Sequence, residues 1–369
     1  MSRLQLFVVV TPGLERLAAA EAAEIGLPAA RVRVQHGGLE VQATERQLYA
    51  IHRWARIPTR VLLRIGAGTA RRWDELQGVV REVDWGRFVA PGAPVSLHVA
   101  SHRSVLYHEG AIAERVAAVI DRPIARGDDT DPAQTAPAVQ AVQAVHVRID
   151  RDRVMLSVDA SGELLHRRGW RTAGHRAPLR STLAAALVRA SGWTGDVPLV
   201  DPMCGSGTIA IEAALAASGR PHDREFAFQR WPSFERGTWA SVTGTSRPDR
   251  LTADVIAADR DAGAVAATRD HVTNAGLDGR VQVVRAPIAA QTWPDRPGVV
   301  VVNPPYGRRV GGDDLRDLYA TLGRRVADGG HRLAMLSADP RLAAATGLEF
   351  DEAFTTANGG IEVRCLVNR

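Results

Sequence analysis

Short apolar runs alternate with helical patterns between residues 179 and 369, and this alternation constrains the fold more than any other feature of the sequence. Parallel strands cannot be joined by tight turns and need crossover helices between them. The pattern therefore predicts an α/β fold built on a doubly wound, Rossmann-like sheet. The expected strands are Val197–Val200, Val255–Ala258, Val281–Val284, Val299–Val302 and Leu333–Leu336, and the expected helices are Leu179–Ser191, Thr208–Ala217, Ala262–Ala275 and Asp314–Val326.

The last two apolar runs of the chain have no helix between them. Glu349–Thr355 and Ile361–Val367 flank an Asn-Gly-Gly sequence at 358–360, which is typical of tight hairpin turns. We therefore expect an antiparallel hairpin to end the sheet. Between the second helix and the second strand, the stretch 221–250 carries five aromatic residues and is expected to be an insertion.

The first 160 residues predict two smaller α/β units, at 1–58 and 59–160. Strand and helical patterns alternate in both, and the polar stretch 126–141 predicts a surface loop. A hairpin of two alternating runs closes the second unit. The expected elements are Phe7–Val10, Leu14–Ile25, a strand pair within Arg31–Val41, Thr44–Trp54, Val61–Ile65, Trp73–Val83, Pro94–Val99, Glu109–Ile120, Ala144–Ile149 and Val154–Asp159.

All 46 basic residues are arginine, against 41 acids, and lysine is absent. A chain without lysine can form no Schiff base and has no P-loop lysine, which excludes two classes of mechanism. Two cysteines, Cys204 and Cys365, make no disulfide framework or metal cluster, and indicate a reducing compartment. No apolar run reaches the length of a membrane span, and the first residues do not resemble a signal peptide. We expect a cytoplasmic, monomeric protein without a metal site.

The excess positive charge lies in one stretch, residues 161–189, where six arginines face one acid. This local excess of five equals the net charge of the whole chain. The stretch begins with a basic linker, 161–180, which joins the N-terminal units to the sheet at 181–369. An aromatic ring among arginines is typical of nucleic acid binding, and a solvated linker is the alternative. The residues expected to contact RNA are Arg167, Arg168, Trp170 and Arg171.

A glycine-rich sequence, Asp-Pro-Met-Cys-Gly-Ser-Gly-Thr at 201–208, lies where the first strand of the sheet ends and a helix begins. Glycines there allow a sharp turn and a close approach of the backbone to a ligand. Gly205 and Gly207 also fit a dinucleotide fingerprint, but the strand-end acid Asp259 follows Gly207 by 52 residues, whereas about 20 is typical. The preceding acid, Asp201, suits the cationic amino acid end of a ligand better than a pyrophosphate.

The sequence Asn303-Pro304-Pro305-Tyr306 follows the expected strand Val299–Val302. Two prolines end the strand and fix the backbone. The Asn303 amide oxygen and the Pro304 carbonyl can accept both hydrogens of an amino group, while Tyr306 stacks on the attached ring. The tetrapeptide therefore predicts a socket for a planar group that carries an amino nitrogen.

Together these motifs resemble the class I S-adenosylmethionine-dependent RNA methyltransferases that carry an N-terminal THUMP domain, among them the bacterial 23S rRNA and tRNA guanine-N2 enzymes. The similarity covers nearly the whole chain, including the runs 157–170, 177–183, 226–231 and 358–362. It implies a ferredoxin-like domain at 1–58, an RNA-binding THUMP domain at 59–160 and a methyltransferase domain at 181–369. The activity implied is methylation of the exocyclic N2 of a guanine in rRNA or tRNA.

The resemblance also implies a role for each motif residue. The base would be held by Asn303, Pro304, Pro305 and Tyr306. The cofactor S-adenosylmethionine would be bound by Asp201, Cys204, Gly205, Ser206, Gly207, Thr208, Asp259, Arg260 and Asn303.

One departure concerns the third strand, after which many such enzymes carry an acid that binds adenine. Here the residues are Arg-Ala-Pro-Ile at 285–288, so backbone groups would have to serve. Three alternatives stay open: an adenine-N6 DNA methyltransferase, a glutamine methyltransferase acting on a release factor, and a non-catalytic RNA-binding or ribosome-assembly factor.

Overall fold

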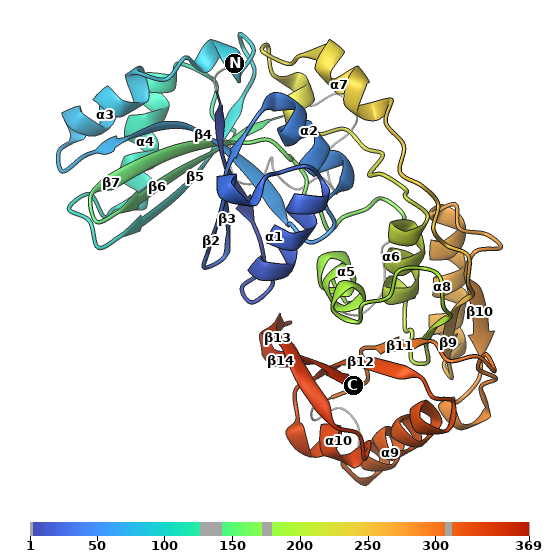
Figure 1. Cartoon of the computed structure of the whole chain (residues 1–369). Helices are drawn as coiled ribbons and strands as arrows, with labels where there is room; N and C mark the ends of the chain where they lie inside the picture. The colour runs from blue at the N-terminus through green and yellow to red at the C-terminus, as the bar shows by residue number, and fades with distance from the viewer. Residues whose placement is uncertain (1–2, 126–141, 172–178, 307–311, 369) are drawn as a thin grey trace.

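Two seven-stranded sheets organise the chain in the computed structural model, which describes residues 3–125, 142–171, 179–306 and 312–368. The N-terminal sheet has the strand order β2-β3-β1-β4-β7-β6-β5, and the C-terminal sheet has the order β10-β9-β8-β11-β12-β14-β13. Helices α5 and α6 of the C-terminal half lie between the two sheets (Figure 1). The predicted loop at 126–141 falls outside the described residues.

The elements of the N-terminal sheet follow the predicted order. Helix α1 packs on strands β2 and β3 and α2 on β3, whereas α3 packs on β4 and β7 and α4 on β5. Thr44 caps α2, because its hydroxyl accepts from the Gln47 amide. The elements are β1 (Leu4–Val9), α1 (Glu15–Glu24), η1 (Ala29–Arg31), β2 (Val32–Gln35), β3 (Gly38–Ala43), α2 (Glu45–Trp54), β4 (Arg60–Thr69), α3 (Trp73–Arg81), η2 (Trp85–Arg87), β5 (Val95–His102), α4 (Glu109–Ile120), β6 (Gln143–Asp150) and β7 (Arg153–Asp159).

The two predicted N-terminal units share one sheet. Strand β1 of the first unit pairs antiparallel with β4 of the second, with Leu6 opposite Leu63 and Val8 opposite Val61. All four side chains are buried in the same core. The sequence patterns suggested a boundary at residue 58, and the hydrogen-bonded strands continue across it.

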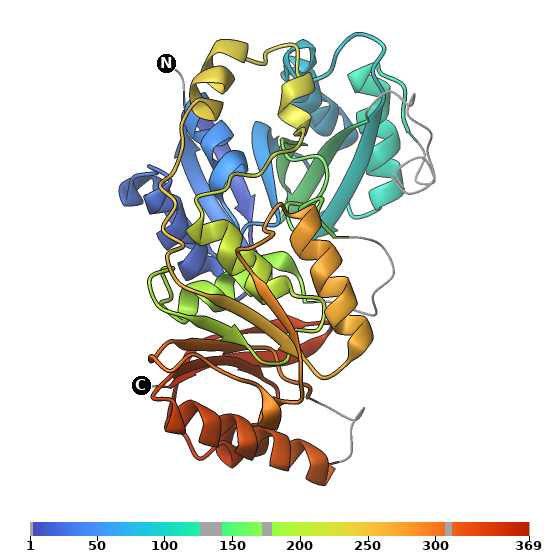
Figure 2. The same cartoon turned by 90° about the vertical axis from the view of Figure 1, so that its right-hand side faces the viewer.

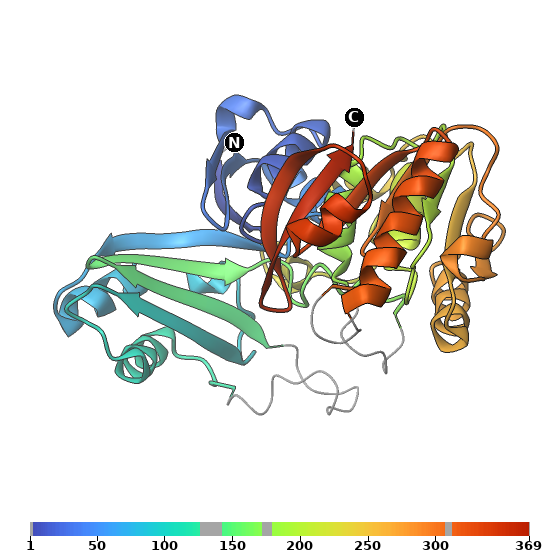
Figure 3. The ribbon, with the colours of Figure 1, turned by 90° about the horizontal axis from the view of Figure 1, so that it is seen from below.

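The C-terminal sheet is doubly wound, as predicted. Strands β8 to β12 are parallel, and the terminal hairpin pairs antiparallel with β12. Helices α5, α6 and α8 cover one face and α9 and α10 the other (Figures 2 and 3). The elements are α5 (Ser181–Ala190), β8 (Leu199–Asp201), α6 (Thr208–Ala217), η4 (Ala227–Arg230), α7 (Arg236–Thr243), β9 (Val255–Asp259), α8 (Ala262–Asn274), β10 (Gln282–Arg285), η5 (Ile288–Ala290), β11 (Val299–Val302), α9 (Gly312–Asp328), β12 (Arg332–Ser337), α10 (Pro340–Ala345), β13 (Phe350–Asn358) and β14 (Ile361–Asn368).

The aromatic insertion at 221–250 joins the two halves of the protein. Its helix α7, which the sequence patterns did not predict, lies against α2 of the N-terminal half. The ring of Tyr49 on α2 stacks on Phe228 of the insertion at a centroid distance of 4.6 Å. Phe226 and Phe228 are both fully buried. The insertion therefore holds the N-terminal half against the C-terminal half through an aromatic core.

Candidate active site

The order of the C-terminal sheet brings three predicted site residues to one edge. Strands β9, β8 and β11 are parallel neighbours, with Val200 opposite Ile256 and Val300. Their carboxyl ends therefore meet, and ligands of open α/β sheets bind at this edge. Asp201 ends β8, Asp259 ends β9, and Asn303 directly follows β11.

The glycine loop between β8 and α6 has the backbone that the sequence predicts. Gly205 and Gly207 have φ values of +53° and +77°, in the left-handed region that favours glycine. A Cβ atom on Gly207 would lie 2.6 Å from Cγ2 of Thr268 on α8, so α8 packs directly on the loop. A Cβ atom on Gly205 would meet no atom within 4 Å. Gly205 thus leaves an open approach to the backbone from the ligand side.

Hydrogen bonds fix the shape of this loop. The Asp259 carboxylate accepts from the Gly205 amide at 2.9 Å with one oxygen and from the Asp261 amide at 2.9 Å with the other. The Thr268 hydroxyl donates to the Gly205 carbonyl at 2.9 Å. On the other side of the loop, the ring Nδ1 of His271 is hydrogen-bonded to the Ser206 carbonyl at 3.0 Å.

Cys204 packs inside the loop. Its amide donates to the Ala258 carbonyl at 2.9 Å, and burial raises the pKa of its thiol. The thiol is therefore protonated, and Cys204 contributes to the site through its backbone and its small volume. Arg260, the residue after Asp259, is exposed, and its predicted role in cofactor binding stays a prediction.

Asp201 is a buried acid at the end of β8. Its side chain is 1% exposed, and neither carboxylate oxygen has a hydrogen-bond partner among the described residues. Burial raises its pKa well above the ordinary value, and the charge of Asp259 raises it further. The Met203 amide lowers the pKa but lies outside hydrogen-bond geometry. An unpaired buried acid beside an open glycine loop fits a ligand that brings an ammonium group, as S-adenosylmethionine does.

The tetrapeptide after β11 forms the second part of the site. The Asn303 amide oxygen is buried and has no hydrogen-bond partner among the described residues, Pro304 is buried and Pro305 is exposed. The Tyr306 hydroxyl accepts from the Asn358 side chain at 2.7 Å, so the terminal hairpin reaches this edge of the sheet. Tyr319 on α9 donates to the Pro305 carbonyl at 3.4 Å. A buried amide oxygen without a partner is the acceptor that an incoming amino group requires.

The loop after the third strand is held by a residue that the sequence patterns did not reveal. Gln291 is 5% exposed, and its side-chain amide donates to the carbonyls of Pro202 at 2.9 Å and Ala286 at 3.1 Å. The Trp293 indole donates to the Gln291 side-chain oxygen at 3.0 Å. Gln291 therefore connects the loops after β8 and β10. No spacing in the sequence distinguishes this glutamine from a surface one.

The predicted RNA contacts at 167–171 require correction. Trp170 is 4% exposed and packs edge-to-face on His271, at a centroid distance of 5.4 Å. The Arg168 side chain is 3% exposed and pairs with Glu212 of α6 at 3.1 Å. Neither side chain is available to stack on RNA or to bind phosphate. Arg167 is exposed, so it alone of these three retains the predicted orientation toward solvent.

Glu212 is the centre of a buried ion-pair network between the two halves. It pairs with Arg168 at 3.1 Å and with Arg56, which follows α2, at 3.3 Å. Arg168 also donates to the Arg56 carbonyl at 2.6 Å. Buried charges need such partners, since an unpaired charge in the interior is strongly destabilising. Arg168, which the sequence suggested as an RNA contact, therefore helps to hold the N-terminal half onto α6, the helix that follows the glycine loop.

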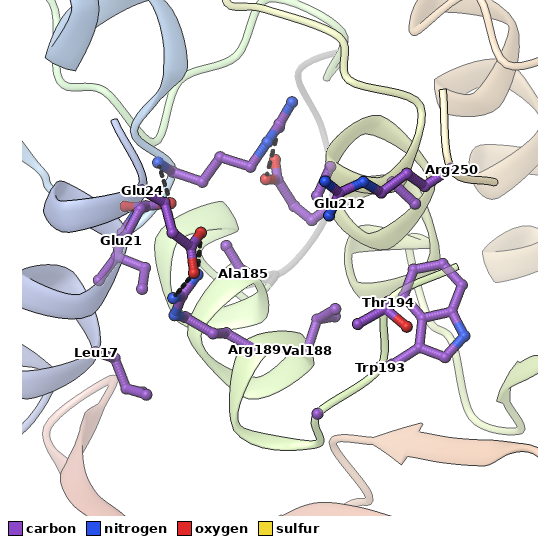
Figure 4. Close-up of a pocket in the computed structure, with 15 residues that line it drawn as sticks. Leu17, Glu21, Glu24, Ala185, Val188, Arg189, Trp193, Thr194, Glu212 and Arg250 are labelled. Atoms are coloured by element: carbon purple, nitrogen blue, oxygen red, sulfur yellow. Dashed lines mark hydrogen bonds and ion pairs between the residues drawn. The ribbon is translucent and has the colours of Figure 1, made fainter. Parts of the chain in front are cut away.

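A cavity of about 450 Å³ lies beside this network, between α1, α5 and α6 (Figure 4). Glu24 and Arg189 form an ion pair across it, and Glu21 accepts from the Arg56 and Ile57 amides at 2.9 and 3.1 Å. Burial raises the pKa of Glu21. None of the lining residues belongs to the glycine loop or to the tetrapeptide after β11. The cavity is therefore a feature of the interface between the two halves.

The described residues contain neither a metal-binding cluster nor a helix that could cross a membrane. No group of three or more potential ligands there could hold a metal ion. No helix in the same part of the chain has the length and apolar character that crossing a bilayer requires.

Comparison with protein families identifies both halves of the chain. Residues 168–366 match the family described as the RMKL-like methyltransferase domain, and residues 5–62 match the RlmL ferredoxin-like domain. A Synechocystis protein described as a candidate RNA methyltransferase is 31% identical over 369 residues, 96% of this chain and 94% of that protein. The ribosomal RNA large subunit methyltransferase K/L of Syntrophotalea carbinolica is 34% identical over 98% of this chain. The chain spans about half the length of that relative, namely 53%.

Solved structures share the same architecture. A Listeria monocytogenes protein described as a predicted N6-adenine-specific DNA methylase is 26% identical, with a TM-score of 0.83 over 99% of this chain and 96% of that one. A methyltransferase crystallised with S-adenosylhomocysteine, SMU.472, is 24% identical, with a TM-score of 0.85 over 100% of this chain and 98% of that one. The chain belongs to the RMKL-like methyltransferase family, whose cofactor is S-adenosylmethionine.

Proposed function

We propose that the chain methylates the exocyclic N2 of a guanine in structured RNA, either 23S rRNA or tRNA. The observation that carries this proposal is the Asn303 amide oxygen, which is buried without a partner in the described part of the chain. It lies at the carboxyl end of β11, next to the strand that ends at Asp201 and two strands from the one that ends at Asp259. The names of the relatives support RNA as the substrate. Guanine N2 is the finer part of the proposal and comes from the resemblance of the motifs.

The cofactor supplies a methyl group on a sulfonium, and the residues of the chain position the nucleophile. The Asn303 oxygen and the Pro304 carbonyl would accept the two N2 hydrogens and direct the nitrogen lone pair at the methyl carbon. The new C–N bond forms as the S–C bond breaks, which leaves S-adenosylhomocysteine. Asn303 is no base, so the proton leaves to water after transfer.

Tyr306 would stack on the guanine once it is turned out of the RNA. Base stacking on an aromatic side chain contributes about 1–3 kcal/mol, which offsets part of the cost of unstacking the base. Tyr306 is partly buried and held by Asn358, so its ring is fixed before the base arrives.

The N-terminal half would supply most of the RNA contacts. The resemblance implies a THUMP domain at 59–160, and the pairing of β1 with β4 joins this segment to the ferredoxin-like unit in one sheet. Arg167, with 53% of its side chain exposed, stays a candidate for contact with phosphate. We propose that the chain acts as a monomer on its RNA.

Mass spectrometry of rRNA and tRNA nucleosides tests the proposal. A strain that lacks the gene should lose one N2-methylguanosine, and the wild-type gene should restore it. The Asn303→Ala variant should not restore it, although it should still bind S-adenosylmethionine in isothermal titration. Loss of N6-methyladenine instead would favour the adenine enzyme named among the solved structures. Failure of the wild-type protein to bind the cofactor would favour a non-catalytic RNA-binding factor.

A further inference from the structure

Arg171 turns inward from the end of the 161–171 segment and reaches the glycine loop. Its guanidinium donates to the Thr208 hydroxyl at 2.7 Å and to the Leu179 carbonyl at 3.1 Å, through the same nitrogen. It also lies over the ring of Trp170, 5.1 Å from the centroid. Thr208 is the first residue of α6 and directly follows Gly207. The structure thus places a cation where the loop meets the helix, and not on an RNA-facing surface.

The charge of Arg171 has no ion-pair partner among the described residues, since no carboxylate oxygen there lies within 4.0 Å of it. Glu212 raises its pKa from a distance, but Glu212 is already paired with Arg56 and Arg168. Burial is the larger influence and lowers the pKa of Arg171. A half-buried cation that has lost part of its hydration without gaining an anion is a site at which an anion binds favourably.

Two further features of the same place favour an anionic group. The first turn of α6 presents backbone N–H groups and the positive end of the helix dipole beside Thr208. The hydroxyl of Thr182, in the first turn of α5, is 0% exposed and has no hydrogen-bond partner in the described part of the chain. Helix α5 packs against α6, and Leu179 just before α5 accepts from Arg171.

The site therefore has two charged ends. As far as the structure describes the chain, Asp201 at the end of β8 is a buried acid without a hydrogen-bond partner, and Arg171, which reaches the start of α6, is a half-buried cation without an ion-pair partner. An amino acid zwitterion carries the complementary pair of charges on one carbon atom. We propose that Arg171 binds the carboxylate of the methionine part of S-adenosylmethionine, while Asp201 binds its ammonium group. This inference rests on the cofactor of the proposed function. It adds Arg171 as the residue by which the site distinguishes S-adenosylmethionine from a form that lacks the carboxylate.

Isothermal titration of the full chain with S-adenosylmethionine and with decarboxylated S-adenosylmethionine tests the inference. The wild-type protein should bind the carboxylate form more tightly. Arg171→Gln should weaken binding of that form by roughly 10- to 100-fold and of the decarboxylated form by less than about threefold, because a hydrogen bond between charged groups is lost in one complex only. Arg171→Lys keeps a charge and should retain part of the preference. Arg332→Gln, an exposed arginine at the opposite edge of the sheet, should change neither affinity.

An equal loss of both ligands in Arg171→Gln would overturn the inference, because Arg171 would then only hold the loop. A wild-type protein that does not distinguish the two ligands would overturn it as well. A wild-type protein that binds neither would remove both this inference and the proposed function. If Arg171→Gln abolishes the preference while the nucleoside analysis shows N6-methyladenine, the inference stands and the guanine assignment fails.

Discussion

The side-chain amide of Asn358 donates a hydrogen bond to the hydroxyl of Tyr306, with 2.7 Å between nitrogen and oxygen. Asn358 ends β13 at the turn of the terminal hairpin, whereas Tyr306 follows β11 in the middle of the sheet. The hairpin is also fixed to the N-terminal half, because the Thr356 hydroxyl donates to the Pro12 carbonyl at 2.7 Å. The ring proposed to stack on the target base is therefore held by the last element of the fold.

Asn358→Ala should lower kcat for RNA methylation by roughly 2- to 12-fold, since loss of one hydrogen bond removes roughly 0.5–1.5 kcal/mol of positioning. Affinity for S-adenosylmethionine should stay unchanged. A double-mutant cycle with Tyr306→Phe checks this coupling, because Asn358→Ala should have no further effect once the hydroxyl is absent. Additive losses in the double variant would show that Asn358 acts independently of Tyr306.

Arg168→Ala should destabilise the protein by about 3–5 kcal/mol, because it removes one of the two cations that neutralise buried Glu212. Arg167→Ala is the matched control. Arg167 is exposed and pairs with exposed Glu163, so its loss should change the free energy of unfolding by about 0.5 kcal/mol or less. Urea denaturation of the two variants measures both values. Equal stabilities would contradict the assignment of Arg168 to the interface between the halves.

Cofactor binding should release a proton from Asp201. Burial raises the pKa of Asp201 in the free protein, and a bound ammonium group would lower it again. The affinity for S-adenosylmethionine should therefore rise with pH until the free carboxyl is fully ionised. Titration calorimetry at one pH, in two buffers of different ionisation enthalpy, measures how many protons are released for each cofactor molecule bound. Asp201→Asn should release none and should bind roughly 10- to 100-fold more weakly.

Stability should fall as the solution is acidified below pH 6.5. Burial lowers the pKa of His52 to about 3, whereas a histidine in the unfolded chain has a pKa near 6.5. The unfolded state therefore takes up a proton that the folded state does not, and the stabilisation present above pH 6.5 is lost as the pH falls toward 3. Between these two pKa values, this residue alone should change the free energy of unfolding by about 1.4 kcal/mol per pH unit.

Urea unfolding at pH 8 to 5 checks the role of His52. His52→Asn should be less stable at pH 8, because the ring is hydrogen-bonded to the Leu48 carbonyl and to the Ser161 hydroxyl. Its stability should nevertheless depend less on pH than that of the wild type. If the free energy of unfolding depends on pH equally in the variant and the wild type, His52 does not contribute to the pH dependence. His146, whose pKa burial lowers to about 4, would then be the next residue to replace.

The parts of the site that the sequence predicts are those encoded by short motifs. Gly205 and Gly207 have positive φ values that glycine adopts readily, and the prolines after Asn303 end their strand. The residue types in both motifs therefore determine the local backbone conformation. The sheet order follows from the alternation of strands and helices. The sequence patterns did not predict helix α10, because six residues are too few to show a helical periodicity of apolar residues.

The parts that could not be predicted depend on contacts between distant segments. Arg168 and Glu212 are 44 residues apart, and nothing near Arg168 in the sequence shows that its charge is neutralised inside the protein. Gln291 and Asn358 likewise acquire their roles only through tertiary partners. Trp170 between arginines suggested RNA stacking, but the ring packs on His271 of a helix a hundred residues later.

The pairing of β1 with β4 has a consequence for how the N-terminal half can be divided. A chain that began at residue 59 would expose the unpaired edge of β4, including Val61 and Leu63, and such edges recruit other chains. The first unit therefore also covers a sheet edge of the second unit, and we expect separation of the two units to favour self-association.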